Sequence, residues 1–319
     1  MNRTSSAGPL RTSVVRLEFK NPIVLASGTA GYGEELVGVM DLAGVGGFVT
    51  KAVSVDPRAG NPAPRVAEFE GGMINAVGLA NPGLQAVRRD HVPWLASNLP
   101  ATRKLMNVVG FSIDDYPRVV AGIEEMLADA MGKAVDGFEL NVSCPNTKAG
   151  GEEFGANPQS LREVVERARR ETKRPLFVKL APTLPDIGDS ARVAADAGAD
   201  AITVVNTVPG LVIDVERRRP VLGFGTGGIS GPAILPIGVR ATWLVRKAVK
   251  LPIMGLGGVS SGTDALQYIV AGASLVGVGT AALRDPRAPA RIVSELETWC
   301  RKHGVNNIQE LTGTLEWPT

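Results

Sequence analysis

Cysteine is almost missing from this sequence. The chain of 319 residues has two cysteines, Cys144 and Cys300, which stand far apart and outside any Cys-x-x-Cys spacing. This usage supports neither a disulfide framework nor a structural zinc site. Iron–sulfur clusters are normally held by a larger set of cysteine thiolates, so the chain cannot carry such a cluster by itself. Cysteines that do not form a disulfide pattern are typical of proteins in a reducing compartment. We therefore expect a cytoplasmic location.

Histidine, long apolar runs and excess charge are also scarce. His91 and His303 fall in predicted helices away from the predicted strand ends, so no histidine base or metal site is expected. No segment reaches the roughly 18 apolar residues that a membrane span needs, and the N-terminal segment lacks the apolar core of a signal peptide. The formal charge of +2, from 34 basic and 32 acidic residues, gives no reason to expect a nucleic-acid or membrane partner.

The sequence instead shows a repeated alternation of apolar runs and amphipathic segments. Runs rich in Val, Ile, Leu and Ala alternate with segments of helical periodicity, which is the pattern of βα units. Eight such units predict an α/β fold, a (β/α)8 TIM barrel with loop insertions at the C-terminal face of the strands, and one domain over residues 1–319. The predicted strands are 22–27, 47–53, 105–111, 138–142, 176–180, 201–205, 253–256 and 275–278. The predicted helices include 114–131, which starts after an Asp cap, 158–172, 232–249 and 260–271.

Two connections, residues 54–84 and 206–231, are longer than ordinary βα loops. Long ordered loops in compact domains are commonly functional. The first is dense in Gly, Pro and Asn, which allow backbone to approach a ligand closely. Within the second, residues 223–228 fit the G-x-G-x-x-G pattern. This match lacks a preceding strand and a following acidic residue, so we do not predict a dinucleotide site there.

Several residues at the ends of the predicted strands can carry chemistry. Cys144 follows the strand 138–142, where TIM-barrel enzymes place reactive groups, although a free cysteine is more often a buried apolar residue. Lys51 and Lys179 stand among apolar strand residues and suggest an anionic ligand, with ion pairs to neighbouring carboxylates as the alternative.

Glycine-rich loops follow the last two predicted strands. They contain Gly257 and Gly258 after one strand and Gly279 and Thr280 after the other. In TIM barrels the loops at these places often bind phosphate through backbone N–H groups. Tight-turn glycines without a ligand are the alternative reading.

These residues together resemble class 1 dihydroorotate dehydrogenases, from about residue 21 to residue 286. The motifs that carry the resemblance are Ala26-Ser27-Gly28, Lys51, Asn75-Ala76-Val77-Gly78-Leu79, Asn141-Val142-Ser143-Cys144-Pro145-Asn146, Lys179, Asn206-Thr207, Ser230-Gly231-Pro232-Ala233 and both terminal glycine loops. The continuation through residues 147–155 resembles class 1B, whereas class 1A continues differently. The sequence departs from the usual family residues at Ala30, Tyr32, Ala52, Val208 and Pro209.

The resemblance implies an FMN-binding barrel that oxidises dihydroorotate to orotate in de novo pyrimidine biosynthesis. It implies FMN contacts at Ser27, Lys51, Ala52, Asn107, Asn141, Lys179, Val205, Gly231, Gly257, Gly258, Gly279 and Thr280. It implies substrate contacts at Lys51, Asn75, Ala76, Val77, Gly78, Leu79, Asn141, Asn206 and Thr207. Cys144 would remove the proton from carbon 5 while hydride leaves carbon 6 for FMN, and Lys51 would be a second catalytic group.

Class 1B also implies where the electrons go. A partner subunit with FAD and an iron–sulfur cluster would pass them to NAD, in a heterotetramer that contains a homodimer of this chain, which agrees with the shortage of cysteine. One alternative is a class 1A-like enzyme that uses fumarate. A phosphate-binding TIM-barrel lyase or isomerase without flavin fits the glycine loops but leaves residues 75–79 and 141–146 unexplained. A non-catalytic ligand-binding barrel is a third alternative, and it explains fewer of these motifs than the lyase or isomerase does.

Overall fold

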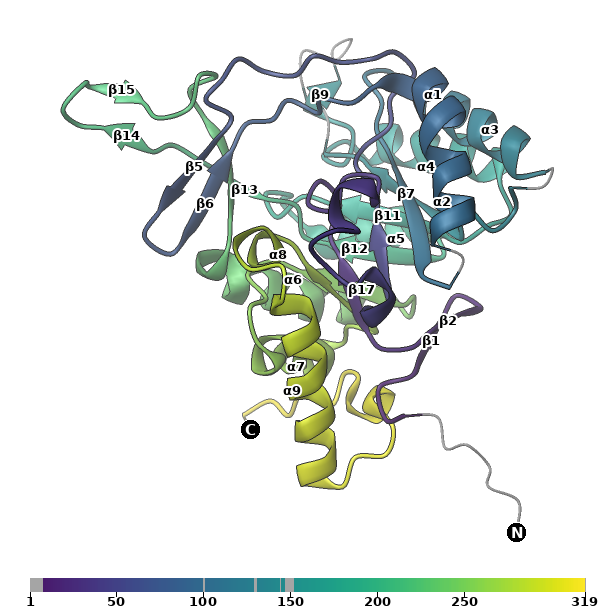
Figure 1. Ribbon diagram of the computed structural model, residues 1–319, viewed down its shortest axis with the longest axis vertical. Helices are drawn as coiled ribbons and strands as arrows, with labels where there is room; N and C mark the ends of the chain where they lie inside the picture. Colours follow the sequence, from purple (N-terminus) through teal and green to yellow (C-terminus); the bar gives the residue numbers. More distant parts are fainter. Residues whose placement is uncertain (1–7, 100, 129–130, 144, 147–151, 319) are drawn as a thin grey trace.

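Eight parallel strands close into a barrel at the centre of the molecule (Figure 1). A computed structural model describes residues 8–99, 101–128, 131–143, 145–146 and 152–318. Around the barrel the strands follow one another in chain order, as the (β/α)8 prediction requires. The barrel strands are β3 (Ile23–Leu25), β4 (Gly47–Val49), β7 (Arg103–Val108), β8 (Gly137–Asn141), β11 (Leu176–Leu180), β12 (Ala201–Val204), β17 (Ile253–Leu256) and β18 (Leu275–Val278). Each predicted strand therefore coincides with a barrel strand, and the fold-class prediction is confirmed.

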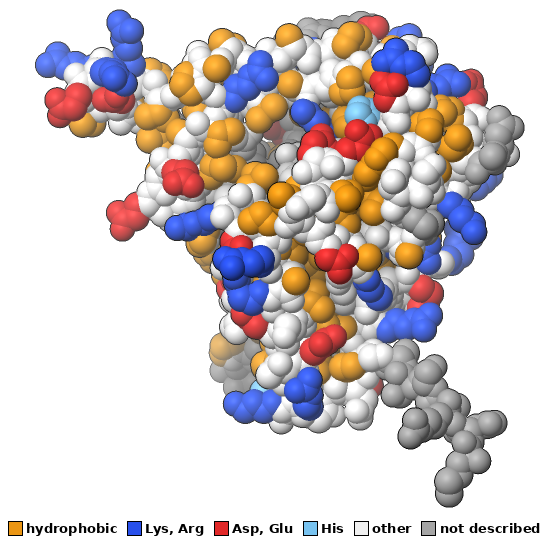
Figure 2. Space-filling view, viewed as in Figure 1, with side chains coloured by type: hydrophobic (Ala, Val, Ile, Leu, Met, Phe, Trp, Pro, Cys, Tyr) orange, Lys and Arg blue, Asp and Glu red, His pale blue; other side chains and the backbone are white. Residues whose placement is uncertain are grey.

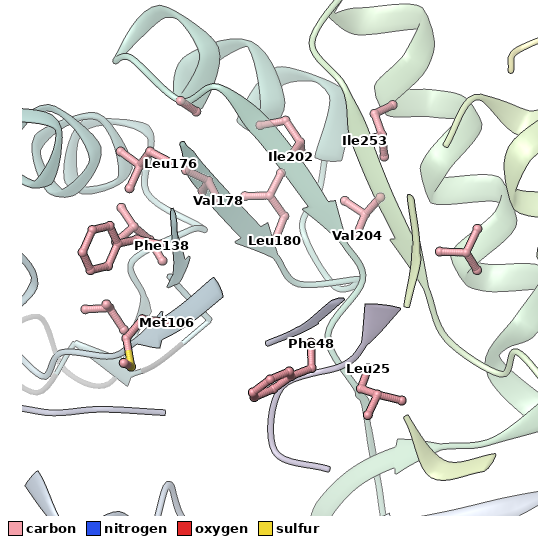
Figure 3. Close-up of a cluster of buried hydrophobic side chains, with 14 of the residues drawn as sticks. Leu25, Phe48, Met106, Phe138, Leu176, Val178, Leu180, Ile202, Val204 and Ile253 are labelled. Atoms are coloured by element: carbon pink, nitrogen blue, oxygen red, sulfur yellow. The ribbon is translucent and has the colours of Figure 1, made fainter. Parts of the chain in front are cut away.

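Alternate residues of these strands enter two separate apolar layers, because successive side chains of a strand point to opposite faces. The outer layer lies between the barrel and its helices; Figure 3 shows the strand residues that contribute to it, among them Leu25, Phe48, Met106, Phe138, Leu176, Val178, Leu180, Ile202, Val204 and Ile253. The inner layer comprises Val24, Val49, Leu105, Phe177, Ala201, Met254 and Leu275. Strands buried on both faces explain the near-continuous apolar runs in the sequence.

Helices cover the outside of the barrel and begin and end at recognisable signals. The helices are α1 (Gly83–Ala86), α2 (Val92–Asn98), α3 (Asp115–Leu127), α4 (Pro158–Glu171), α5 (Ile187–Asp196), α6 (Leu235–Ala248), α7 (Gly262–Ala271), α8 (Thr280–Arg284) and α9 (Ala288–His303). A π-helical segment (Val87–His91) joins α1 to α2, and short 3-10 turns lie at Glu34–Leu36, Leu42–Gly44, Pro232–Ile234 and Ile308–Leu311. No helix in these described parts is long and apolar enough to cross a membrane.

The predicted start of α3 is wrong in one detail. Asp114 does not cap the helix with its side chain, which instead pairs with Arg167. The neighbouring Asp115 accepts hydrogen bonds from the N–H groups of Phe111 and Ser112 at 2.8 and 3.0 Å. Asp115 is the first residue of the helix, so its carboxylate reaches back to the preceding loop and does not cap the helix either. The predicted start of α4 is confirmed, because Asn157 accepts a hydrogen bond from the N–H of Ser160 at 2.9 Å.

A hairpin that the sequence analysis did not predict closes the amino-terminal end of the barrel. Strands β1 (Thr12–Val14) and β2 (Leu17–Phe19) pair antiparallel. Val14 and Phe19 are buried against the inner layer of the barrel. The cavity of the molecule must therefore lie at the opposite, carboxyl-terminal end of the strands.

The two long connections form a second sheet rather than irregular loops. Strands β5 (Val66–Phe69) and β6 (Gly72–Asn75) come from the first connection, and β13 (Val208–Gly210) and β16 (Gly227–Ser230) from the second. They form a four-stranded antiparallel sheet, the insertion sheet, in the order β13-β16-β6-β5. Because β6 pairs with β16, segments more than a hundred residues apart in the chain meet beside the barrel mouth.

A further hairpin extends beyond the insertion sheet. It is formed by β14 (Ile213–Asp214) and β15 (Arg219–Pro220), and it projects from the molecule in Figure 1. Figure 2 shows charged side chains gathered at its tip and hydrophobic side chains over the sheet beside it. The exposed hydrophobic residues of this region include Val66, Leu211, Ile213, Val215 and Phe224. The tip is thus solvated and the sheet below it is partly apolar.

Short strands β9 (Pro145–Asn146) and β10 (Glu152–Glu153) pair antiparallel between β8 and α4. They lie on either side of residues 147–151, which fall outside the described part of the chain together with Cys144. These strands follow the end of β8 at the same end of the barrel as the insertion sheet.

A close contact between α6 and α7 depends on a glycine in the first turn of α6. A Cβ at Gly238 would overlap the hydroxyl of Tyr268 and lie 2.9 Å from the carbonyl oxygen of Leu256. Gly238→Ala should therefore lower the free energy of unfolding by about 1–2 kcal/mol, because overpacking outweighs the gain in helix propensity. Urea unfolding would measure the change.

The matched control is Gly38→Ala, since a Cβ at Gly38 meets no atom within 4 Å. It should change the free energy of unfolding by less than about 0.5 kcal/mol. Adding Tyr268→Phe should recover part of the loss in Gly238→Ala because it removes the overlapped hydroxyl. Equal stability of Gly238→Ala and the parent would contradict the packing account.

Candidate active site

A cavity of about 1870 Å³ opens at the carboxyl-terminal end of the barrel strands. Its walls come from the strand ends, from the loops after β17 and β18 and from the insertion sheet. This is the end at which TIM-barrel enzymes carry their active sites. The volume exceeds that of a typical single-ligand pocket, so the cavity has room for two ligands at once.

Every described residue of the two predicted binding sets lines this one cavity. Those at or just after barrel strands are Ser27, Lys51, Ala52, Asn107, Asn141, Lys179, Val205, Asn206 and Thr207. Those from the insertion and the glycine loops are Asn75, Ala76, Val77, Gly78, Leu79, Gly231, Gly257, Gly258, Gly279 and Thr280. Residues spread over most of the sequence thus face a common space, whereas Cys144 lies outside the described residues.

Two lysines give the cavity a positive floor. Lys179 is 4% exposed, and its Nζ donates a hydrogen bond to Ser27 Oγ at 3.1 Å. Lys51 is half-buried, and its backbone N–H is held by the carbonyl of Gly31 at 2.7 Å. In the described part of the chain, no carboxylate oxygen lies within 4.0 Å of either ammonium nitrogen. The ion-pair alternative from the sequence analysis therefore has no support there, and an anionic ligand remains the better explanation.

A buried polar pair lies next to this floor. Asn107 and Glu139 are each 1% exposed, and Asn107 Nδ2 donates a hydrogen bond to Glu139 Oε1 at 2.7 Å. The Oδ1 atom of Asn107 is fully buried and has no hydrogen-bond partner among the described residues. Buried polar atoms are nearly always satisfied, so this atom is an exception in the barrel interior.

Three side chains that line the cavity form a hydrogen-bonded cluster. Ser143 Oγ donates to Asn141 Oδ1 at 2.6 Å and accepts from Asn206 Nδ2 at 2.5 Å. Asn206 Oδ1 in turn accepts from the N–H of Thr207 at 2.9 Å. Ser143 was not among the predicted site residues, although it adjoins Cys144 in sequence. Its contact with Asn206 joins the segments that follow β8 and β12, which lie on either side of β11, and the sequence pattern does not reveal this contact.

The cavity-lining segments at Asn75 and Lys51 are held by neighbouring elements. Asn75 Nδ2 donates to the carbonyl of Gly228 at 3.2 Å across the insertion sheet. Tyr32, one of the departures from the family pattern, donates its hydroxyl to the carbonyl of Ala52 at 3.0 Å and stacks on His91 at a centroid distance of 4.1 Å. Tyr32 thus fixes the backbone next to Lys51 without entering the cavity.

The two glycine loops present backbone N–H groups to the cavity. Gly257 and Gly258 have φ angles of 127° and 75°, which side chains rarely adopt, and Tyr268 donates its hydroxyl to the carbonyl of Gly257 at 2.7 Å. The N–H groups of Gly258, Gly279 and Thr280 find no acceptor among the described residues. A Cβ at Gly279 would meet only Ala26 and Thr29, each at 3.6 Å. Packing therefore tolerates a side chain at Gly279, and the open N–H groups suit a phosphate.

Glu153 adds a carboxyl group to the cavity wall, and burial raises its pKa above the usual range. Unpaired ammonium groups, an amide cluster and free N–H groups together suit a phosphorylated cofactor and a planar, amide-bearing substrate. The fold and the cavity thus define a TIM-barrel enzyme with an anion-binding site at the strand ends.

The sequence matches the family model of dihydroorotate dehydrogenase over residues 9–299. The chain belongs to the dihydroorotate dehydrogenase family and is therefore an oxidoreductase, which confirms the family and enzyme predictions.

Relatives match along almost the whole chain. A Pelobacter propionicus protein named dihydroorotate dehydrogenase B (NAD(+)), catalytic subunit, is 45% identical over 308 residues, which cover 96% of this chain and 98% of that protein. A Trichlorobacter lovleyi protein of the same name is 46% identical, with 94% and 96% covered. A Solibacter usitatus protein, provisionally named dihydroorotate dehydrogenase A (fumarate), is 47% identical, with 97% and 99% covered.

Ser143 should matter for substrate turnover because it orders two amides of the cavity. Ser143→Ala removes the acceptor of Asn206 and the donor to Asn141, a loss of about 1 kcal/mol. We expect kcat/KM for dihydroorotate to fall roughly fivefold, as measured by steady-state kinetics with an artificial electron acceptor. The control is Ser190→Ala, since the hydroxyl of Ser190 is exposed and donates only to the carbonyl of Asp186. An unchanged kcat/KM in Ser143→Ala would remove Ser143 from the site.

Proposed function

We propose that this chain is the FMN-binding catalytic subunit of an NAD-linked dihydroorotate dehydrogenase. It oxidises dihydroorotate to orotate in de novo pyrimidine biosynthesis and acts as one FMN-binding unit over residues 1–319. The observation that carries the proposal is the single cavity that joins two lysines without carboxylate partners to an amide cluster and two glycine loops. The names of the relatives support the reaction and the NAD-linked class.

The residues of the cavity fit FMN. The open N–H groups of Gly258, Gly279 and Thr280 suit its phosphate. Asn107 and Asn141 line the cavity and carry amides that suit the polar edge of the flavin ring. Lys179, held by Ser27, would contribute positive charge near the ring. When bound, FMN supplies the oxidation by accepting hydride from carbon 6 of dihydroorotate.

The remaining residues hold the substrate. Asn75, Asn141 and Asn206 have amides that can donate to and accept from the fixed edges of a pyrimidine ring. The backbone from Ala76 to Leu79 and the hydroxyl of Thr207 complete this set. Lys51 would bind negative charge on the substrate and stabilise charge that develops during the reaction. A substrate fixed in this way loses little further entropy on the way to the transition state.

Cys144 is the proposed base that removes the proton from carbon 5. In the sequence it adjoins Ser143, which lines the cavity, and it stands three residues beyond the end of β8. A thiolate is the active form of a cysteine base, and a free thiol is mostly protonated at neutral pH. The rate of substrate oxidation is therefore expected to rise with pH until the thiol is ionised.

The electrons are proposed to leave through a second protein. This partner would carry FAD and an iron–sulfur cluster and would reduce NAD, in a cytoplasmic heterotetramer that includes a homodimer of this chain. The naming of relatives as catalytic subunits supports a separate electron-transfer subunit. The fumarate-linked alternative is kept because one similar relative carries that name.

The base assignment has a direct test. Cys144→Ala should retain FMN but reduce its flavin with dihydroorotate about 10²–10⁴-fold more slowly, the usual contribution of a general base. Rapid mixing with absorbance detection would follow the flavin. Cys300→Ala is the matched control, because Cys300 is buried in α9 and does not line the cavity. Flavin reduction in Cys144→Ala at the parent rate would show that another group is the base.

The cofactor and the electron acceptor can be tested together on the purified chain. We expect a yellow protein whose flavin is bleached by dihydroorotate under anaerobic conditions. The reduced protein alone should transfer electrons to neither NAD nor fumarate. Transfer to NAD should appear when an electron-transfer subunit from one of the NAD-linked relatives is added.

Each contrary result has a distinct meaning. A colourless chain that FMN cannot turn yellow would favour the non-flavin lyase or isomerase. Rapid reoxidation by fumarate would favour the fumarate-linked class, and NAD reduction by this chain alone would remove the need for the partner.

A further inference from the structure

We propose that Ser230 is a specificity-determining residue of the cofactor site, whose hydroxyl donates a hydrogen bond to the phosphate of FMN and distinguishes FMN from riboflavin. The inference rests on the proposed FMN-binding function and deepens it. The FMN contacts that the family resemblance implies include two neighbours of Ser230 in the cavity wall, Gly231 and Thr280, but not Ser230 itself.

Ser230 is the last residue of β16 and stands where the insertion sheet meets the barrel. In the register of that sheet it is opposite Met73 of β6. Its side chain contacts Thr280, the first residue of α8, with Thr280 Oγ1 at 2.7 Å from Ser230 Oγ. A Cβ at Gly258 would lie 2.9 Å from the carbonyl oxygen of Gly231, so the chain next to Ser230 also touches the loop after β17. Ser230 therefore lies beside both glycine loops.

The hydroxyl pair of Ser230 and Thr280 belongs to the end of the cavity with open N–H groups. Both residues line the cavity, and both are partly exposed. The backbone N–H groups of Gly258, Gly279 and Thr280 find no acceptor among the described residues. Backbone N–H groups of glycine-rich loops are common donors to phosphate oxygens. A phosphate held by the N–H of Thr280 would therefore lie beside the hydroxyl pair.

The number of O–H protons in this pair indicates that one is available to a ligand. Each hydroxyl carries one proton, and the hydrogen bond between the two oxygen atoms uses one of them. Among the described residues, the other proton has only the carbonyl oxygen of Met73, which lies 3.4 Å from Ser230 Oγ. Hydrogen bonds between oxygen atoms normally measure about 2.5–3.0 Å, so this contact is a weak one. Ser230 can therefore turn its proton to a better acceptor.

The chemistry of the pair selects a ligand that accepts a hydrogen bond. Thr280 donates to Ser230 Oγ, and this donation makes the Ser230 hydroxyl a stronger donor. A phosphate oxygen carries negative charge, so the hydrogen bond that it accepts is stronger than one to a neutral oxygen. Riboflavin has the same ring and side chain as FMN but a neutral hydroxyl in place of the phosphate. The contribution of Ser230 should therefore appear for FMN alone.

The position of Ser230 gives the insertion sheet a part in cofactor binding as well as in substrate binding. Two residues before Ser230, the carbonyl of Gly228 accepts a hydrogen bond from Asn75 Nδ2 at 3.2 Å. Asn75 is a proposed substrate residue. One short strand would thus contact the phosphate at its end and hold a substrate residue at its middle, so the two ends of the cavity share one structural support.

Ser260 provides a matched control in the same cavity wall. It follows Gly258 by two residues, in the loop after β17, and it also lines the cavity. Unlike Ser230, it donates its hydroxyl to Asp264 Oδ2 at 2.8 Å, so its proton is already used. Ser260→Ala should therefore leave the affinities for FMN and riboflavin unchanged.

The experiment titrates FMN and riboflavin separately into the apoprotein of the parent, Ser230→Ala, Ser230→Cys, Thr280→Val and Ser260→Ala. Quenching of flavin fluorescence gives each dissociation constant. Riboflavin binding and thermal unfolding of the apoprotein both control for folding, since riboflavin needs the same cavity but has no phosphate. Ser230→Cys nearly keeps the size of the side chain but has a weak donor, so it carries the test if Ser230→Ala does not fold.

We expect Ser230→Ala and Ser230→Cys to weaken FMN binding about tenfold, the usual effect of losing one hydrogen bond to a charged group, and to leave riboflavin binding unchanged. Thr280→Val should lose less FMN affinity, because Ser230 keeps its proton. Parent-like FMN affinity in Ser230→Ala, an equal loss of riboflavin affinity, or a larger loss in Thr280→Val than in Ser230→Ala would overturn the inference. A parent chain that binds neither flavin would instead contradict the proposed function.

Discussion

The alternation of side chains along the barrel strands determines where polar chemistry can exist in this molecule. One face of each strand packs against helices and the other faces the barrel interior. Near the amino-terminal end the interior is filled by apolar residues, and towards the carboxyl-terminal end it becomes polar, with Asn107, Glu139 and Lys179 almost fully buried. The apolar layers stabilise the fold, and this stability allows a small number of polar groups to be held without water.

The insertion sheet completes the site that the barrel begins. Its strands come from two connections far apart in the chain, and pairing of β6 with β16 fixes Asn75 opposite Gly228. A sheet is more rigid than two separate loops, so the cavity-lining residues of β6 and β16 are ordered by backbone hydrogen bonds as well as by packing. The hydroxyls of Tyr32 and Tyr268 add supports from outside the cavity, each to a backbone carbonyl of a site segment.

The barrel could be predicted from the sequence because its strands are buried on both faces and therefore appear in the sequence as continuous apolar runs. The sequence was not sufficient for β5, β6, β13 and β16, which are short, rich in glycine and only partly buried. The motifs and their order along the chain predicted one binding site, and the described residues of that prediction line one cavity. The contact between Asn107 and Glu139 depends on the pairing of β7 with β8, and the contact between Ser143 and Asn206 joins segments on either side of β11. No local sequence pattern contains that information. The position of Cys144 relative to the cavity stays a prediction.

The hairpin of β1 and β2 gives the barrel a blind end. With Val14 and Phe19 seated against the inner layer, the cavity has access from the carboxyl-terminal side of the strands alone. Substrate and product must then share one mouth. Orotate must therefore leave by the path along which the next dihydroorotate molecule enters. The hairpin at the amino-terminal end of the barrel thereby constrains how ligands exchange at the carboxyl-terminal end.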